Sequence, residues 1–190
     1  MWAIEKTIVQ MLLPLFLLST TSFAYQDIIE ETEETTNSLC SVPVEIIEVI
    51  AKVERHAKRP VGYQYIIAFN KQEEANTVKT AIGKDLFLDW RTIDCKNTRL
   101  CTKLLSYIVK DFNIDNMDLG AFQINYHHHK MPLDDYFSFE KSYLKACNYL
   151  ETLIANYGYS WQSIAKYNHK DPKVNYAYLQ KISTILGSNQ

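Results

Sequence analysis

The stretch SVPVEIIEVIAKVERHAKR, residues 41–59, decides the fold class because it predicts an amphipathic helix. Ser41 and Pro43 form a helix start signal, and no glycine or later proline interrupts the run before Pro60. At 100° per residue, apolar side chains gather on one face and charged side chains on the other. The apolar face comprises Ile46, Val49, Ile50, Val53 and Ala57, and the charged face comprises Glu45, Glu48, Lys52, Arg55 and Arg59. We therefore expect one helix over residues 41–59.

Glu54 breaks this sorting, because it lies one turn after Ile50 and two turns after Ile47 on the apolar side. Burying an ionised carboxylate costs several kcal/mol and raises its pKa toward neutrality. A half-buried glutamate that holds its proton is suited to general acid catalysis. The alternative is a structural role, in which Glu54 pairs with a buried arginine or caps a neighbouring helix.

The composition indicates one domain that is not specialised for nucleic acid. The chain has 190 residues, 47% of them hydrophobic, and a formal net charge of -2. This suits a single domain with a substantial core. There is no basic excess and no lysine or arginine cluster beyond Lys58-Arg59, so nucleic-acid binding is not expected.

The first 24 residues have the pattern of a secretory signal peptide. A basic residue, Lys6, precedes an apolar run over residues 8–18 and the small residues that end at Ala24. The run is too short to cross a membrane, although an uncleaved anchor is the alternative. Residues 25–39 are acidic and read as a flexible leader. We expect a soluble periplasmic or secreted protein, cleaved near Ala24.

Four cysteines in an exported chain predict two disulfides. Three pairings are possible, and we favour Cys95 with Cys101 and Cys40 with Cys147. The second pairing would close a long loop and could stabilise the fold by up to about 4 to 5 kcal/mol. A zinc site is the alternative, but no Cys-x-x-Cys pair supports it.

The rest of the chain predicts a mainly α-helical domain over residues 40–187, with a tail at 188–190. Further helices are expected over residues 100–112, from Ser138 to Gly158, after Ser160, and from Pro172 to Gly187. Residues 63–69 predict a strand that could pair with residues 86–90, while residues 70–84 are polar and expected to be exposed. These segments would form a small β-hairpin or an irregular insertion.

Two further segments carry candidate binding residues. Residues 119–126, Leu-Gly-Ala-Phe-Gln-Ile-Asn-Tyr, alternate as an extended chain does, and Lys166-Tyr167-Asn168 ends a later helix. Adjacent histidines at 127–129 invite a metal hypothesis, but neighbouring side chains point in different directions. We expect an exposed loop there and no metal.

The ordered set of Glu54, Gly120-Ala121-Phe122-Gln123-Ile124-Asn125 and Tyr167-Asn168 resembles the lytic transglycosylases of the goose-type-lysozyme-like class (SLT domain). The likeness covers about residues 40–186 and includes an Asp118-Leu119-Gly120 variant found in small members associated with type IV secretion and conjugation. Arg55 stands where the family usually has serine. Ala121-Phe122 replaces Leu-Met, and Lys166 replaces alanine.

The resemblance implies a lysozyme-like single domain that cleaves peptidoglycan without a cofactor. Glu54 would protonate the glycosidic oxygen between N-acetylmuramic acid and N-acetylglucosamine, and would then accept the proton of the muramyl 6-hydroxyl as that oxygen closes a 1,6-anhydro ring. Substrate-binding residues would be Gln123, Asn125, Tyr167, Asn168, Phe122 and Tyr63. The expected partners are glycan strands and secretion-system or conjugation components, and the expected state is a monomer.

Other interpretations stay open at the level of sequence. Asp118 could act as a second carboxylate and make the protein a lysozyme-like hydrolase. Gln123 and Asn125 could instead satisfy backbone groups, and Tyr167 could be a core aromatic residue. The protein could also be a non-catalytic murein-binding component of a secretion system.

Overall fold

The computed structural model describes residues 39–187. The predicted signal peptide at 1–24, nearly all of the leader at 25–39 and the tail at 188–190 lie outside the described residues. Within the described range, six α-helices accompany a small four-stranded sheet, so the mainly α prediction with a small β insertion is confirmed. None of the helices in this range is long and apolar enough to cross a membrane.

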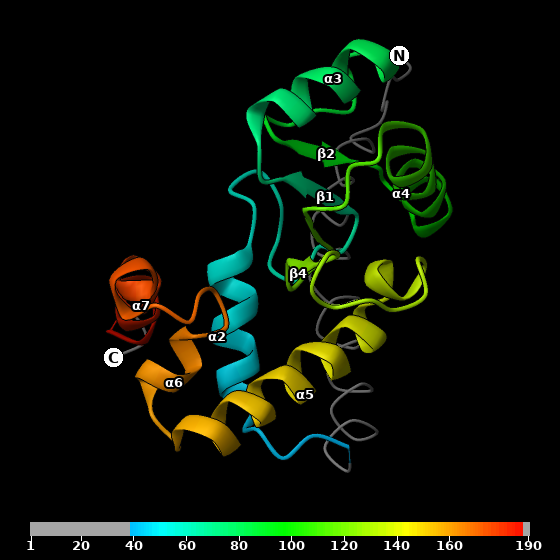
Figure 1. The fold of residues 1–190 in the computed structure, drawn as a ribbon. Helices are drawn as coiled ribbons and strands as arrows, with labels where there is room; N and C mark the ends of the chain where they lie inside the picture. Colours follow the sequence, from blue (N-terminus) through cyan, green and yellow to red (C-terminus); the bar gives the residue numbers. More distant parts are fainter. Residues whose placement is uncertain (1–38, 188–190) are drawn as a thin grey trace, which may run out of the picture. The chain divides into compact units, whose positions relative to one another are not determined.

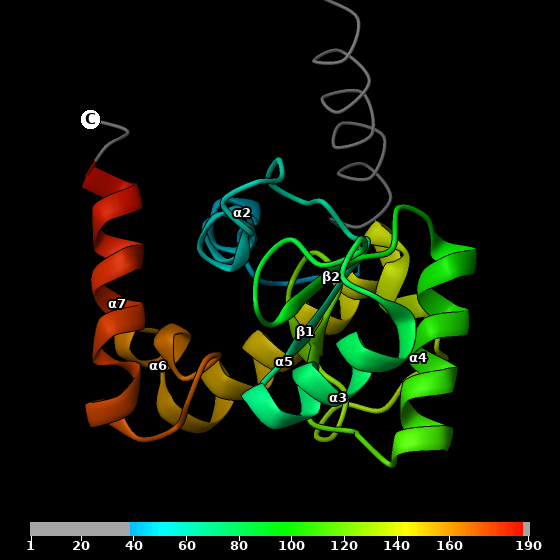
Figure 2. The ribbon, with the colours of Figure 1, turned by 90° about the horizontal axis from the view of Figure 1, so that it is seen from above.

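Four helices form one group. Two of its members, α6 and α7, lie on the side opposite to α3 (Gln72–Ile82) and α4 (Thr98–Phe112), which are outside the group, in both Figure 1 and Figure 2. The group consists of α2 (Val44–Glu54), α5 (Phe139–Tyr157), α6 (Trp161–Ala165) and α7 (Pro172–Gly187). Helix α2 packs against α5 and α7, and α6 packs against the same two helices. The apolar face of α2 therefore lies within the core, where Ile47 and Ile50 are almost fully buried.

The boundaries of α5 and α6 follow from caps that the sequence predicts. The side chain of Ser138 accepts a hydrogen bond from the backbone N–H of Lys141, and that of Ser160 accepts one from Ser163. Gly158, with a φ of 80°, ends α5 in a conformation that a β-carbon disfavours. The predicted helices after Ser138 and Ser160 are confirmed.

The sheet is antiparallel, with the strand order β2-β1-β3-β4. Its strands are β1 (Ile66–Phe69), β2 (Thr92–Asp94), β3 (Met117–Leu119) and β4 (Ile124–Asn125). Two further helices, α3 (Gln72–Ile82) and α4 (Thr98–Phe112), pack against the fully buried β1. The short 3₁₀ helix η1 (Asp135–Phe137) contacts α4 and α5. The pairing of Asp118 with Asn125 in the β3–β4 hairpin sets the register at the site described below.

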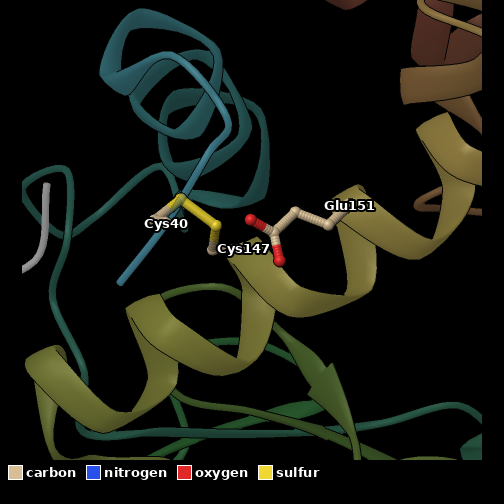
Figure 3. Close-up of side chains that lie close together, drawn as sticks. All are labelled: Cys40, Cys147 and Glu151. Carbon is tan, nitrogen blue, oxygen red and sulfur yellow. A yellow bond between two sulfur atoms is a disulfide. The ribbon is translucent and has the colours of Figure 1, made fainter. Parts of the chain in front are cut away.

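Both predicted disulfides are confirmed. Cys40 bonds to Cys147 across a sequence separation of 107 residues and fixes the segment before α2 to α5 (Figure 3). Cys95 bonds to Cys101 across six residues and joins the end of β2 to α4. Since Cys40 lies four residues before Val44, the first residue of α2, the long disulfide holds the chain close to the start of the helix that carries Glu54.

Three sequence predictions about local structure are wrong. The first helix ends at Glu54 rather than Arg59, and Ala57, predicted on its apolar face, is exposed. Residues 72–82, predicted as an exposed polar segment, form α3, because Ala75 and Val78 reach the core. Strand β1 pairs with 92–94 rather than with 86–90, and Phe87 forms an isolated bridge with Ile93 of β2 instead.

Candidate active site

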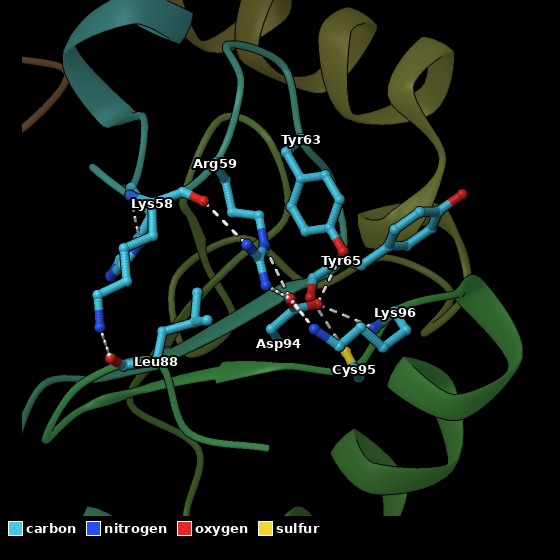
Figure 4. Close-up of polar contacts among 9 residues, drawn as sticks. Lys58, Arg59, Tyr63, Tyr65, Leu88, Asp94, Cys95 and Lys96 are labelled. Carbon is cyan, nitrogen blue, oxygen red and sulfur yellow. Dashed lines mark hydrogen bonds and ion pairs between the residues drawn. The ribbon is translucent and has the colours of Figure 1, made fainter. Parts of the chain in front are cut away.

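Glu54 is the last residue of α2, and contacts made after it explain why the helix ends there. Arg55 has an extended backbone, with φ of −58° and ψ of 130°. Arg59 then donates to the buried carboxylate of Asp94 on β2, with Nε 2.7 Å from Oδ2. The hydroxyl of Tyr63 donates to the other carboxylate oxygen at 2.8 Å (Figure 4). These bonds hold the connection from α2 to the sheet, so Glu54 sits at a fixed helix terminus.

The carboxyl of Glu54 is surrounded by protein on most sides while the residue keeps some exposure to the cleft described below. Removal from water raises the pKa of Glu54 from 4.5 to about 7. The hydroxyl of Tyr178 on α7 donates to Oε1 at 2.6 Å and lowers the pKa, as do Lys181 and Arg91, whereas the charge of Asp118 raises it. A position at the C-terminal, negative end of a helix also disfavours the ionised form. The protonated acid is therefore well populated near neutrality.

The turn between β3 and β4 presents Gln123 to the same region. Gly120 has a φ of 72°, and a β-carbon there would clash with the carbonyl oxygen of Tyr136. Gln123 also has a positive φ, 47°, and its Nε2 donates to the carbonyl oxygen of Gly120 at 2.9 Å. A residue other than glycine with a positive φ has an unfavourable backbone conformation that its surroundings must hold, and such residues cluster at functional sites.

A polar network connects the two strands next to this turn. Asn125 donates from Nδ2 to Oδ1 of Asp118 and to Oδ1 of Asn116, both at 2.9 Å. Arg91 Nη2 lies 3.2 Å from the other oxygen of Asp118 and 3.0 Å from Oδ1 of Asn70. Asp118 is thus a carboxylate paired with a cation, in contrast to Glu54, whose direct partner is a neutral hydroxyl.

A cleft with a volume of about 840 Å³ brings most of the predicted site residues together. Glu54, Gln123, Asn125, Tyr167 and Asn168 all line it, although they come from α2, the β3–β4 hairpin and the segment after α6. The other lining residues are Asn70, Asp118, Ile124, His128, His129, Lys145, Ala146, Tyr149, His169 and Lys170. The only acids among the lining residues are Glu54 and Asp118.

Three rings of the cleft lining contact one another in a row at tilted angles. The ring of Tyr167 lies 5.5 Å from that of Tyr149, which lies 4.5 Å from the ring of His129. The hydroxyl of Tyr167 donates to the carbonyl oxygen of Phe122 at 2.9 Å, so it fixes the hairpin turn. Burial, with the nearby charge of Glu54, raises the pKa of Tyr167 well above its usual range. Tyr167 is therefore a neutral ring that supports the wall.

Two predicted binding residues do not line the cleft. The side chain of Phe122 is buried against Phe139 and Tyr143, because it completes the core beneath the hairpin. Tyr63 lies instead in a smaller pocket that Glu54 also lines, and the Tyr63 hydroxyl donates a hydrogen bond to Asp94. Direct contact of these side chains with a ligand in the cleft is not supported.

Tyr178 is a candidate site residue that sequence reasoning missed. Its position in the last helix predicts a core contact, and it is indeed 5% exposed. The signal that could have identified it is its hydroxyl, since a buried tyrosine needs a polar partner. The alternative left open, that the two amides satisfy backbone groups, agrees with their hydrogen bonds: Gln123 donates to the carbonyl of Gly120, and Asn125 Oδ1 accepts from the backbone N–H groups of residues 127 and 128.

The histidine run is exposed as predicted at His127 and His128, but not at His129. His127 is exposed, with Nδ1 2.7 Å from Asp115, but His129 is half-buried and lines the cleft. Burial, followed by the charges of Lys145, His128 and Lys170, lowers the pKa of His129.

Within residues 39–187, one group of three metal-ligating side chains lies close together, namely Cys40, Cys147 and Glu151 (Figure 3). The two sulfur atoms form a disulfide and are not thiolates. The Glu151 carboxylate accepts hydrogen bonds from the backbone N–H and the hydroxyl of Ser41, both at 2.7 Å. This group anchors the segment before α2, and it does not have the chemistry of a metal site.

Comparison with known proteins found no matching protein-family model, no matching curated protein and no matching solved structure. A function is therefore inferred from the cleft and from the residues that meet there.

Proposed function

We propose that the protein is a peptidoglycan lytic transglycosylase with a lysozyme-like domain of the SLT type. One observation carries this proposal: Glu54, whose burial raises its pKa to about 7, lines a large cleft together with four other residues of the ordered motifs, Gln123, Asn125, Tyr167 and Asn168. A pKa near the working pH lets one group first give and then take a proton efficiently.

In the proposed reaction, protonated Glu54 donates to the glycosidic oxygen that links N-acetylmuramic acid to N-acetylglucosamine, and the bond from that oxygen to the muramyl anomeric carbon breaks. The muramyl 6-hydroxyl oxygen bonds to that carbon, and its proton passes to the Glu54 carboxylate. Glu54 is thereby reset, no water is consumed, and one acid serves both steps. The hydrogen bond from Tyr178 stabilises the carboxylate formed after the first transfer.

The cleft is suited to a glycan. Its lining combines polar side chains suited to sugar hydroxyls, such as those of Asn70 and Asn168, with the aromatic wall formed by Tyr149 and Tyr167. Aromatic faces pack against the apolar faces of sugar rings while their edges remain polar. The two disulfides suit an oxidising compartment. We propose the periplasm, with peptidoglycan strands as substrate, secretion or conjugation components as partners and a monomeric state.

The second candidate is a lysozyme-like hydrolase. It is favoured by Asp118, which lines the same cleft, pairs with Arg91 and raises the pKa of Glu54 by its charge. Two carboxyl groups with different environments are the usual equipment of glycoside hydrolysis.

The test is release of soluble fragments from purified murein sacculi by the mature protein, with Glu54→Gln and Glu45→Gln as a matched pair. Both changes remove a carboxyl from α2, but Glu45 is exposed at the other end of the helix. Glu54→Gln should abolish release and Glu45→Gln should keep it. Sacculus binding without any release by the wild-type protein would instead support a non-catalytic murein-binding component.

A further inference from the structure

One end of the cleft carries basic side chains that the proposed proton transfers do not use. They come from three separate parts of the chain: the segment after β4, helix α5, and the connection between α6 and α7. We call them the basic rim, which comprises His128, His129, Lys145, His169 and Lys170. His129 interacts electrostatically with Lys145, His128 and Lys170, so these groups lie near one another.

The positive charge of the basic rim is not neutralised within the described part of the chain. Neither the Lys145 nor the Lys170 ammonium forms an ion pair among residues 39–187. The two acids of the cleft do not neutralise this positive charge, because Asp118 pairs with Arg91 and Glu54 holds a proton near neutrality. An anionic ligand in the cleft would therefore meet unpaired cations at this end.

Two rim histidines are oriented by contacts of their own. The ring of His129 contacts that of Tyr149 in a tilted arrangement, with centroids 4.5 Å apart, which continues the aromatic wall from Tyr167 to the rim. His169 Nδ1 accepts the backbone N–H of Asp171 at 3.1 Å. The neutral ring of His169 therefore carries its proton on Nε2, where it can donate to a ligand. The rim is continuous with the wall along which we propose the glycan lies.

This inference rests on the proposed function and names the part of the substrate that the rim recognises. In peptidoglycan the sugar backbone is uncharged, since the lactyl group of muramic acid is joined to a peptide by an amide bond. The carboxylates lie on that peptide. Lysine ammonium groups and histidine N–H groups are donors suited to carboxylates. We propose that the basic rim binds a carboxylate of the stem peptide next to the bond that is cleaved, so that the protein prefers peptide-bearing strands with free carboxylates.

The experiment compares two substrates that differ only in charge. Peptide-bearing glycan strands are used as isolated or after carbodiimide coupling with ammonia, which turns their carboxylates into amides. The ratio of kcat/KM values on the two substrates is measured for the wild-type protein, for Lys145→Gln/Lys170→Gln and for the control Lys141→Gln/Lys173→Gln. The control removes two exposed lysines at neighbouring positions on α5 and α7 that do not line the cleft.

For the wild-type protein we expect kcat/KM to be about tenfold higher on untreated strands, the order of magnitude of two partly exposed ion pairs. The ratio should fall to about one in the rim variant and stay about tenfold in the control. Equal rates on the two substrates for the wild-type protein, or an unchanged ratio in the rim variant, would overturn the inference. Cleavage of neither substrate by the wild-type protein would contradict the proposed function itself.

Discussion

Replacing Glu54 with glutamine should stabilise the protein at alkaline pH and leave its stability almost unchanged in mild acid. Glutamine has nearly the same shape as protonated glutamic acid, and its carbonyl oxygen can accept the hydrogen bond from Tyr178. The substitution therefore removes the cost of ionising a buried carboxyl with little change in packing. Under the proposed function, this cost is the stability that the protein gives up for a proton-holding acid at its active site.

The magnitude follows from the pKa of Glu54, raised from 4.5 to about 7. Because the folded-state pKa lies above the unfolded value, the native protein keeps a proton that the unfolded chain releases between about pH 4.5 and pH 7. The free energy of unfolding of the wild-type protein thus falls as pH rises through this window. At 1.36 kcal/mol per pKa unit, the loss that Glu54→Gln avoids amounts to at most about 3 kcal/mol above pH 7.

The assay is denaturant unfolding with intact disulfides at about pH 4.5 and about pH 8, on the wild-type protein, Glu54→Gln and Glu45→Gln. The Glu54 variant should exceed the wild-type protein by about 2 to 3 kcal/mol at the higher pH and by less than about 0.5 kcal/mol at the lower. Glu45 is exposed in the first turn of the same helix, so its variant should not reproduce the gain. An equal effect of Glu54→Gln at both pH values would refute the reasoning that burial holds the proton.

Three further predictions test the surroundings of this acid. Gly120→Ala should lower the unfolding free energy by about 3 kcal/mol or more, because the added β-carbon would meet backbone atoms. The control Gly83→Ala, with a similar φ but open space around it, should cost about 1 kcal/mol. Similar losses in both variants would show that Gly120 is not sterically constrained. Tyr178→Phe removes a hydrogen bond that lowers the pKa of Glu54, so this pKa should rise and the alkaline limb of the pH–rate profile should move to higher pH. A shift of that limb to lower pH would contradict the prediction. Cys147→Ser should lower the melting temperature under oxidising but not under reducing conditions, by the equivalent of about 4 to 5 kcal/mol for a loop of this length. Equal melting temperatures of variant and wild type under oxidising conditions would show that Cys147 is not bridged.

The parts of the fold that sequence predicts well are those governed by local signals. Ser138 and Gly158 mark the two ends of α5, and Ser160 and Pro172 mark the starts of the next two helices. Capping and helix termination depend on a few neighbouring residues. The disulfide pairing was also accessible, because Cys95 and Cys101 are close in sequence and leave one partner for Cys147.

The end of α2 could not be predicted, because it depends on a distant residue. Nothing local interrupts the helical pattern between Glu54 and Pro60, yet Arg59 is drawn to Asp94 on β2, 35 positions away in sequence (Figure 4). The same holds for α3, whose sequence is polar except where Ala75 and Val78 meet the core. Tertiary contacts override local preference in both segments.

The candidate site was predictable as a set of residues but not as an arrangement. Glu54 stands out as an acid on an apolar face and Gln123 as an amide three residues after a glycine, and both line the cleft. The role of Phe122 was misjudged and that of Tyr178 was missed, because sequence does not show which buried aromatic side chain only fills the core and which also reaches the acid. One is buried under the hairpin, and the other donates its hydroxyl to the acid.

The most direct test of the proposed chemistry is mass spectrometry of the fragments that the mature wild-type protein and Glu54→Gln release from murein sacculi. We expect the wild-type protein to yield muropeptides that end in 1,6-anhydro-N-acetylmuramic acid, lighter by one water than hydrolysed products, and the variant to yield none. Products with reducing ends would assign a hydrolase instead, and fragments released equally by both proteins would contradict a catalytic role for Glu54.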